Sequence, residues 1–132
     1  MELFPVTLPA DTFRSTKLRL EPVRGDGMEP TLRGGRDFVL IKPTHTYEGE
    51  AIYLIDLDGD GEHVGLRRCD RMLGRSNGGA IRLMLDNPVY GRSGPTVVSR
   101  EVFDGAVLGI VVADVKVRAD HVLHDVLEGR AA

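Results

Sequence analysis

The sequence predicts a mostly β, barrel-like antiparallel domain that ends in a short helix. Three observations predict this fold. Short apolar runs of strand length recur along the chain at close, regular spacing. Most of these runs are separated by glycine-rich turns, which suit the tight connections between antiparallel strands. Near the end of the chain, apolar residues fall at positions i, i+1, i+4 and i+5, which is the spacing of one helix face.

The chain of 132 residues has the length of one domain. Residues 1–16 carry Pro5 and Pro9 among apolar residues without a clear period, so we expect an irregular N-terminal arm there. The alternative is a partly ordered terminus or the remains of a linker. Residues 17–132 are expected to form the folded domain.

Four strands are predicted in the first half of the chain. They are residues 18–23, 38–42, 50–55 and 63–69. The second is continuously apolar, which is typical of a strand buried on both faces. The last two are joined by residues 56–61, whose Asp-Gly pairs tolerate a left-handed backbone and predict a hairpin turn.

The second half is predicted to add three strands and a helix. The strands are residues 80–85, 96–99 and 106–113, with an extension of the last to Val117. Residues 120–127 are the predicted helix, since their apolar residues share one face and Asp120 can act as the N-cap.

Composition limits the classes of partner. The net charge is −3 and no block of five or more basic residues occurs, so we expect no direct DNA binding by this domain alone. No apolar run approaches the roughly 18 residues of a membrane span, and no signal peptide is visible. The single cysteine, Cys69, excludes an internal disulfide and favours a cytoplasmic location.

Residues 23–32, hereafter the elbow, organise the rest of the chain. Gly25 and Gly27 flank Asp26, so the backbone there can bend sharply or adopt a left-handed conformation. The residues after Gly27 are predicted to begin a helix. Strand, tight turn and helix start would place position 27 on an exposed corner beside the free N–H groups of that helix.

The predicted helix start depends on three residues. Met28 and Leu32 are four apart and would share one face of a helical turn. Pro30 suits the first turn, where its missing N–H costs nothing.

Residues 25–32 read Gly-Asp-Gly-Met-Glu-Pro-Thr-Leu. This stretch resembles the nucleophile motif Gly-Asp-Ser-Met-Glu-Pro-Thr-Leu of the LexA-like and phage-repressor self-cleaving peptidases, which are related to bacterial signal peptidases. Every position of the motif matches except the third: the matching residues are Gly25, Asp26, Met28, Glu29, Pro30, Thr31 and Leu32. Gly27 stands where the family has its nucleophilic serine.

Three further stretches resemble the same family. Residues 66–69 match the strand that carries a Lys-Arg pair, with Arg67 at the position of the lysine that serves as general base. Residues 81–90 are similar to Leu-x-Ser-Asn/Asp-Asn-Pro-x-Tyr, and residues 107–111 to Ile-x-Gly-x-Val. The matching residues of the former motif include Asp86, Asn87 and Pro88. The four motifs follow the family's order and cover about residues 20–117.

Both halves of the family's serine–lysine dyad are missing at these positions. A desolvated lysine can become neutral and accept the serine proton, whereas arginine stays protonated at any working pH. Glycine has no side chain that could attack a carbonyl. We therefore expect a pseudo-peptidase and no enzyme. Two alternatives remain: a peptidase inactivated by substitution in the laboratory, or one whose nucleophile is Ser15, Ser76, Ser93 or Ser99.

The resemblance implies a LexA/signal-peptidase-like fold and a role in joining chains. We expect a homodimer or higher homo-oligomer that serves dimerisation and protein–protein interaction in prophage-type transcription regulation. The apolar strand at residues 106–113 could offer an edge or a face to the symmetric partner. The chain is then the C-terminal fragment of a repressor or a free-standing domain. The alternative is a free-standing antirepressor, a decoy that binds related repressor chains.

No metal or cofactor is expected. Residues 56–61 resemble the opening of a calcium-binding loop, but the twelfth position, where such a loop needs glutamate, is Arg67. His121 and His124 are three apart, and we expect them on a solvated face of the C-terminal helix.

Overall fold

The computed structural model describes residues 17–72 and 79–129. Seven strands form one antiparallel sheet in the order β1-β2-β7-β3-β4-β5-β6. The strands are β1 (Arg19–Pro22), β2 (Phe38–Pro43), β3 (Ala51–Asp56), β4 (Val64–Arg71), β5 (Ile81–Met84), β6 (Thr96–Val98) and β7 (Val107–Val115). The helices are η2 (Pro88–Ser93), α1 (Arg100–Ala106) and α2 (Asp120–Leu127).

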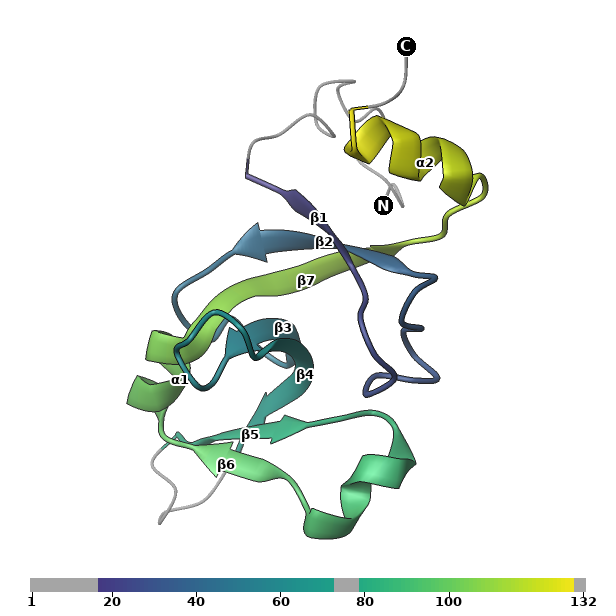
Figure 1. Cartoon of the computed structure of the whole chain (residues 1–132). Helices are drawn as coiled ribbons and strands as arrows, with labels where there is room; N and C mark the ends of the chain where they lie inside the picture. Colours follow the sequence, from purple (N-terminus) through teal and green to yellow (C-terminus); the bar gives the residue numbers. More distant parts are fainter. Residues whose placement is uncertain (1–16, 73–78, 130–132) are drawn as a thin grey trace, which may run out of the picture.

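The predicted antiparallel β class is confirmed, and each of the seven predicted strands has a counterpart. The sheet is strongly twisted, with β1, β2 and β7 at one end of the molecule and β5 and β6 at the other (Figure 1). It is an open sheet in which β1 and β6 are the end strands, so closure into a barrel is not observed in the described part of the chain.

The helices differ from the predictions in three respects. The predicted helix at residues 120–127 is confirmed as α2, but its N-cap is Ala119, which makes no side-chain capping bond, and Asp120 is the first helical residue. Helices η2 and α1 were not predicted from the sequence. In α1 the Ser99 hydroxyl accepts a hydrogen bond from the N–H of Val102 at 3.1 Å, which is an ordinary helix start.

The predicted helix start at residues 28–32 is wrong. This stretch forms turns, in which a single helix-like bond joins the N–H of Leu32 to the carbonyl of Met28 at 2.9 Å. The carbonyl of Gly27, which a helix would use internally, accepts a hydrogen bond from the N–H of Asn87 at 2.9 Å. A tertiary contact therefore replaces the helical hydrogen bond.

Two apolar cores lie on opposite faces of the sheet, because neighbouring residues of β3 alternate between them. The α1 core consists of Tyr53, Ile55, Cys69, Ile81, Leu83, Phe103, Ala106 and Val107. The elbow core consists of Val23, Met28, Leu32, Val39 and Ile41. The elbow is thus one wall of a core, and burial of Met28 and of Leu32 each contributes about 1.5–3 kcal/mol to holding it in place.

Aromatic rings fill the centre of the α1 core. Tyr53 and Phe103 are fully buried, and their rings meet edge to face with centroids 5.2 Å apart. The buried Tyr53 hydroxyl donates to the carbonyl of Gly49 at 2.7 Å and accepts from the N–H of Glu48 at 2.8 Å. The hydroxyl therefore both donates and accepts a hydrogen bond, so its burial costs little free energy.

Strand β7 lies in the middle of the sheet, paired with β2 on one side and β3 on the other. Of the edge or face that residues 106–113 were expected to offer, the edge is therefore excluded where β7 pairs on both sides, and the face stays a prediction. Its side chains are accessible in part, since Leu108 is 45% and Val112 50% exposed.

In the described ranges, every helix is too short or too polar to span a bilayer.

Candidate functional site

The candidate site is the elbow together with the residues that follow β5 (Figure 1). In the elbow, Gly25 adopts a left-handed backbone with φ of 72°, whereas Gly27 does not. Met28 is buried, Glu29 is half-buried and Pro30 is exposed, and the bond between Glu29 and Pro30 is cis. The backbone at position 27 therefore accepts residues other than glycine.

Asn87 ties the elbow to the end of β5. Its Nδ2 donates to the carbonyl oxygen of Asp26 at 2.9 Å, and its backbone N–H donates to Gly27. Its Oδ1 also accepts the N–H of Val89 at 3.1 Å and so caps η2, in which Pro88 takes the first position. One side chain thus orders the elbow and starts the next helix.

A second pair of contacts joins the same two segments. The Tyr90 hydroxyl donates to Oδ1 of Asp26 at 2.6 Å, which raises the pKa of Tyr90. The Thr31 hydroxyl donates to Oδ2 of Asp86 at 2.5 Å. Motif residues more than 50 positions apart in the sequence are therefore in direct contact.

Asp86 also anchors β4. Its two oxygens accept hydrogen bonds from Nε and Nη2 of Arg68, both at 2.7 Å, and its side chain is 13% exposed. The bonds from Arg68 lower the pKa of Asp86, against the opposing effect of burial. This forked pair is a strong charge-assisted contact at the base of the site.

The side chain of Leu85 occupies the space beside position 27. A Cβ atom added to Gly27 would lie 2.9 Å from Cδ2 of Leu85, which is closer than carbon atoms normally approach. Leu85 also lines the cavity that contains Arg67. Gly27 and Arg67, which the resemblance aligns with the family's nucleophile and base, thus both lie near Leu85, a relation that spacing along the sequence does not reveal.

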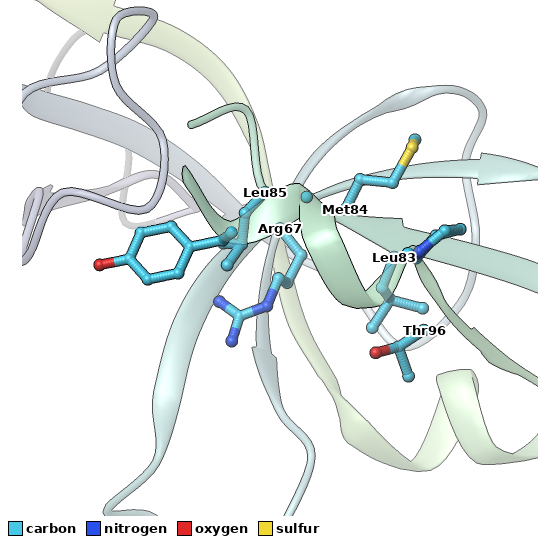
Figure 2. Close-up of a pocket in the computed structure, with 9 residues that line it drawn as sticks. Arg67, Leu83, Met84, Leu85 and Thr96 are labelled. Carbon is cyan, nitrogen blue, oxygen red and sulfur yellow. The ribbon is translucent and has the colours of Figure 1, made fainter. Parts of the chain in front are cut away.

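Arg67 lies in a cavity of about 340 Å³ beside β5 and η2. Its Nη1 donates to the carbonyl of Leu66 at 2.8 Å. Figure 2 shows its side chain next to Leu85, with Leu83 and Thr96 to one side and Met84 directed away from it. An arginine here supplies a permanent positive charge and hydrogen-bond donors, and no base.

Two other side chains that could act as nucleophiles, those of Cys69 and Ser99, are poorly placed for chemistry. Cys69 is fully buried, and burial raises the pKa of its thiol to about 12, so the thiolate form is suppressed at neutral pH. Ser99 is engaged as the N-cap of α1. Ser15 and Ser76 lie outside the described residues, and Ser93 ends η2.

The predicted hairpin turn at residues 56–61 is confirmed. The Asp56 carboxylate accepts the N–H groups of Gly59 and Gly61, at 3.1 and 2.9 Å. The expected absence of a tight calcium site stays a prediction. The sequence analysis did not group Asp58, Asp60 and His63, whose exposed side chains offer ligand atoms within 4.8 Å of one another.

The C-terminal histidines lie where they were expected. His121 and His124 of α2 are both exposed. The His124 ring meets Phe38 edge to face, with centroids 6.2 Å apart. The predicted solvated face of the helix is confirmed.

No family model matches the sequence, and no curated protein matches it. What the site can do follows from its own residues: hydrogen bonds anchor the elbow, position 27 has no side chain, and Arg67 supplies a positive charge.

Proposed function

We propose that this chain is a catalytically inactive domain of the LexA-like and phage-repressor type, with a signal-peptidase-like fold. One observation carries the proposal. Hydrogen bonds from Asn87 and Tyr90 to Asp26 anchor the elbow. At position 27, where the family has its nucleophile, glycine has no side chain and Leu85 occupies the adjacent space. In the pattern that residues 81–90 resemble, the position of Leu85 is a small serine.

The other half of the dyad supports the same conclusion. Arg67 stands at the position of the general base and cannot lose its proton at a working pH. With a leucine methyl group beside Gly27 and the charged Arg67 in the adjoining cavity, the site has neither a nucleophile nor a base. The domain therefore works by binding.

We further propose that it joins chains, as a homodimer or higher homo-oligomer in prophage-type transcription regulation in the cytoplasm. An exposed apolar surface supports this assignment. Leu108 and Val64, 45% and 38% exposed, border a hollow of about 320 Å³ whose other lining residues are Ile41, Leu54, Pro43 and the charged Arg19 and Glu21. A second copy that covers this surface would bury leucine and valine side chains that now contact water.

The first test is self-cleavage. The purified chain is incubated at pH 10, where an active relative would hold a neutral lysine, and its intact mass is followed. We expect a constant mass, because position 27 has no nucleophile. A discrete cut whose rate is independent of protein concentration would contradict the proposal.

A further inference from the structure

Arg67 differs from Arg68 and Arg82, its neighbours on β4 and β5, in having no carboxylate partner in the described part of the chain. Arg68 forms two hydrogen bonds with Asp86, and Arg82 forms two with Asp70, at 2.9 and 2.6 Å. Within residues 17–72 and 79–129, the one hydrogen bond of the Arg67 guanidinium is to the Leu66 carbonyl, and no carboxylate forms an ion pair with it. Most of its guanidinium donors are therefore available to a ligand.

The cavity around Arg67 has the composition of an anion pocket with apolar walls. None of its lining residues is acidic: Arg67, Leu83, Met84, Leu85, Tyr90, Gly91, Gly94, Pro95 and Thr96. Asp26, which contacts the lining residue Tyr90, accepts a hydrogen bond from the hydroxyl of that tyrosine. A bound anion would thus meet one positive charge and no negative lining residue.

The size of the cavity limits the ligand. About 340 Å³ lies at the low end of the range for small-molecule sites and suits one residue-sized group. Leucine side chains and Pro95 line one part of it, so an apolar body attached to the anion gains burial. A planar guanidinium matches the two oxygens of a carboxylate in a forked pair.

We propose that this pocket binds a carboxylate carried on an apolar body of about the size of leucine, with Arg67 pairing the carboxylate. The ligand is either the C-terminal residue of a peptide or a free apolar acid. The inference goes beyond the assembly role proposed above and rests on the pocket alone. Its failure would show in binding measurements, and failure of the assembly role in the oligomeric state.

The test compares two probes that differ in charge alone. N-acetyl-L-leucine and N-acetyl-L-leucinamide are titrated into the full chain by isothermal titration calorimetry. We expect the acid to bind at least tenfold more tightly than the neutral amide. Equal affinity of the two probes, or no binding of the acid at 10 mM, would overturn the proposal without any need for a variant.

Two variants then locate the contact. Arg67→Gln is expected to weaken binding of the acid at least tenfold, because the amide side chain cannot form the forked charged pair. The control is Arg36→Gln, which removes an exposed arginine elsewhere and is expected to leave the affinity unchanged. Circular dichroism of both variants verifies the fold. Unchanged affinity in folded Arg67→Gln would overturn the assignment of the pocket.

Peptides distinguish the two sources of the carboxylate. A hexapeptide that ends in leucine is compared with its C-terminally amidated form and with N-acetyl-L-leucine. Tenfold tighter binding of the free-acid peptide than of the amino-acid derivative would assign the pocket to chain termini. Equal binding of these two acids would assign it to small apolar acids, and binding of the amidated peptide as tight as the acid would contradict the proposal.

Discussion

Gly27 and the Leu85 side chain are so close that the side chain accepted at either position depends on the residue at the other. The backbone at Gly27 lies outside the left-handed region, and an added Cβ would meet Cδ2 of Leu85 at 2.9 Å. We expect Gly27→Ala to destabilise the domain by about 1 kcal/mol, at the low end for overpacking because the contacted atom ends a flexible side chain. Urea unfolding measures the effect.

The control for this prediction is the background Leu85→Ala. There the space is free, so the same change at position 27 is expected to cost close to nothing. The difference between the two backgrounds is the coupling energy of the pair. An equal cost in both backgrounds would show that the two residues do not compete for space.

Asp86 links the charge state of one carboxyl to the stability of the whole site. Because hydrogen bonds from Arg68 lower its pKa in the folded state, its contribution is present above the unfolded pKa of about 3.9 and lost as the pH falls through the lower folded value. We expect Asp86→Asn to lower the free energy of unfolding by about 1.5–3 kcal/mol at pH 7. Urea unfolding at pH 7 and pH 3 should show this loss shrinking at the acidic pH.

Asp114→Asn provides the comparison, because Asp114 is an exposed carboxylate of β7. It is expected to change stability by less than about 0.5 kcal/mol at either pH. If Asp86→Asn lost the same free energy at both pH values, the ion pair with Arg68 would not be the source of the stability.

At the residue scale, the sequence identified the residues that hold the elbow in place but not the residue that packs against Gly27. Asp26, Asn87 and Pro88 were predicted as motif residues through the resemblance, and they are in contact or start the next helix. The role of Leu85 was missed, because it depends on packing against a glycine 58 positions earlier. Such a contact leaves no periodicity in either segment.

At the scale of the elements, Gly109 of β7 packs directly against β2. A Cβ atom on Gly109 would lie 2.3 Å from Cγ2 of Ile41 and 3.0 Å from the carbonyl oxygen of Lys42. We expect Gly109→Ala to destabilise the domain by about 1–3 kcal/mol, since the strands must separate to admit the methyl group. The urea midpoint measures this change.

Gly105 of α1 gives a matched control. No atom lies within 4 Å of a Cβ built there, so Gly105→Ala is expected to raise stability by about 0.5–1 kcal/mol through the better helix propensity of alanine. A similar loss for both variants would argue that glycine at 109 is not needed for close packing.

The sequence predicted elements well where local pattern decides them. All seven strands and α2 follow from apolar runs and from a helical stripe. The helix at residues 28–32 was predicted wrongly because Asn87 takes the Gly27 carbonyl, and α1 was missed because its seven residues are too short to show a period. Local propensity loses to tertiary contacts in the first case and carries little signal in the second.

At the scale of the molecule, the order of strands is the feature least accessible from the sequence. The last strand, β7, inserts between β2 and β3, so the middle of the sheet is completed by the end of the chain. No turn links β7 to its neighbours, and apolar pattern alone does not rank partners. Because β7 lies at the centre of the sheet, we expect a second copy to contact a face of the sheet there, and not an edge.

That face leads to a prediction about assembly. Leu108 is 45% exposed and borders the hollow formed with Val64, Ile41 and Leu54. If a second copy covers this surface, light scattering at tens of micromolar should give about twice the 14.5 kDa of one chain. Leu108→Glu is expected to return the mass to that of one chain, because a charge would then be buried without a partner.

Val102→Glu, which places the same charge on a 52% exposed residue of α1, is expected to leave the dimer intact. A single-chain mass for the unaltered protein would contradict the assembly itself, whereas a dimer that survives Leu108→Glu would move the interface to another part of the surface.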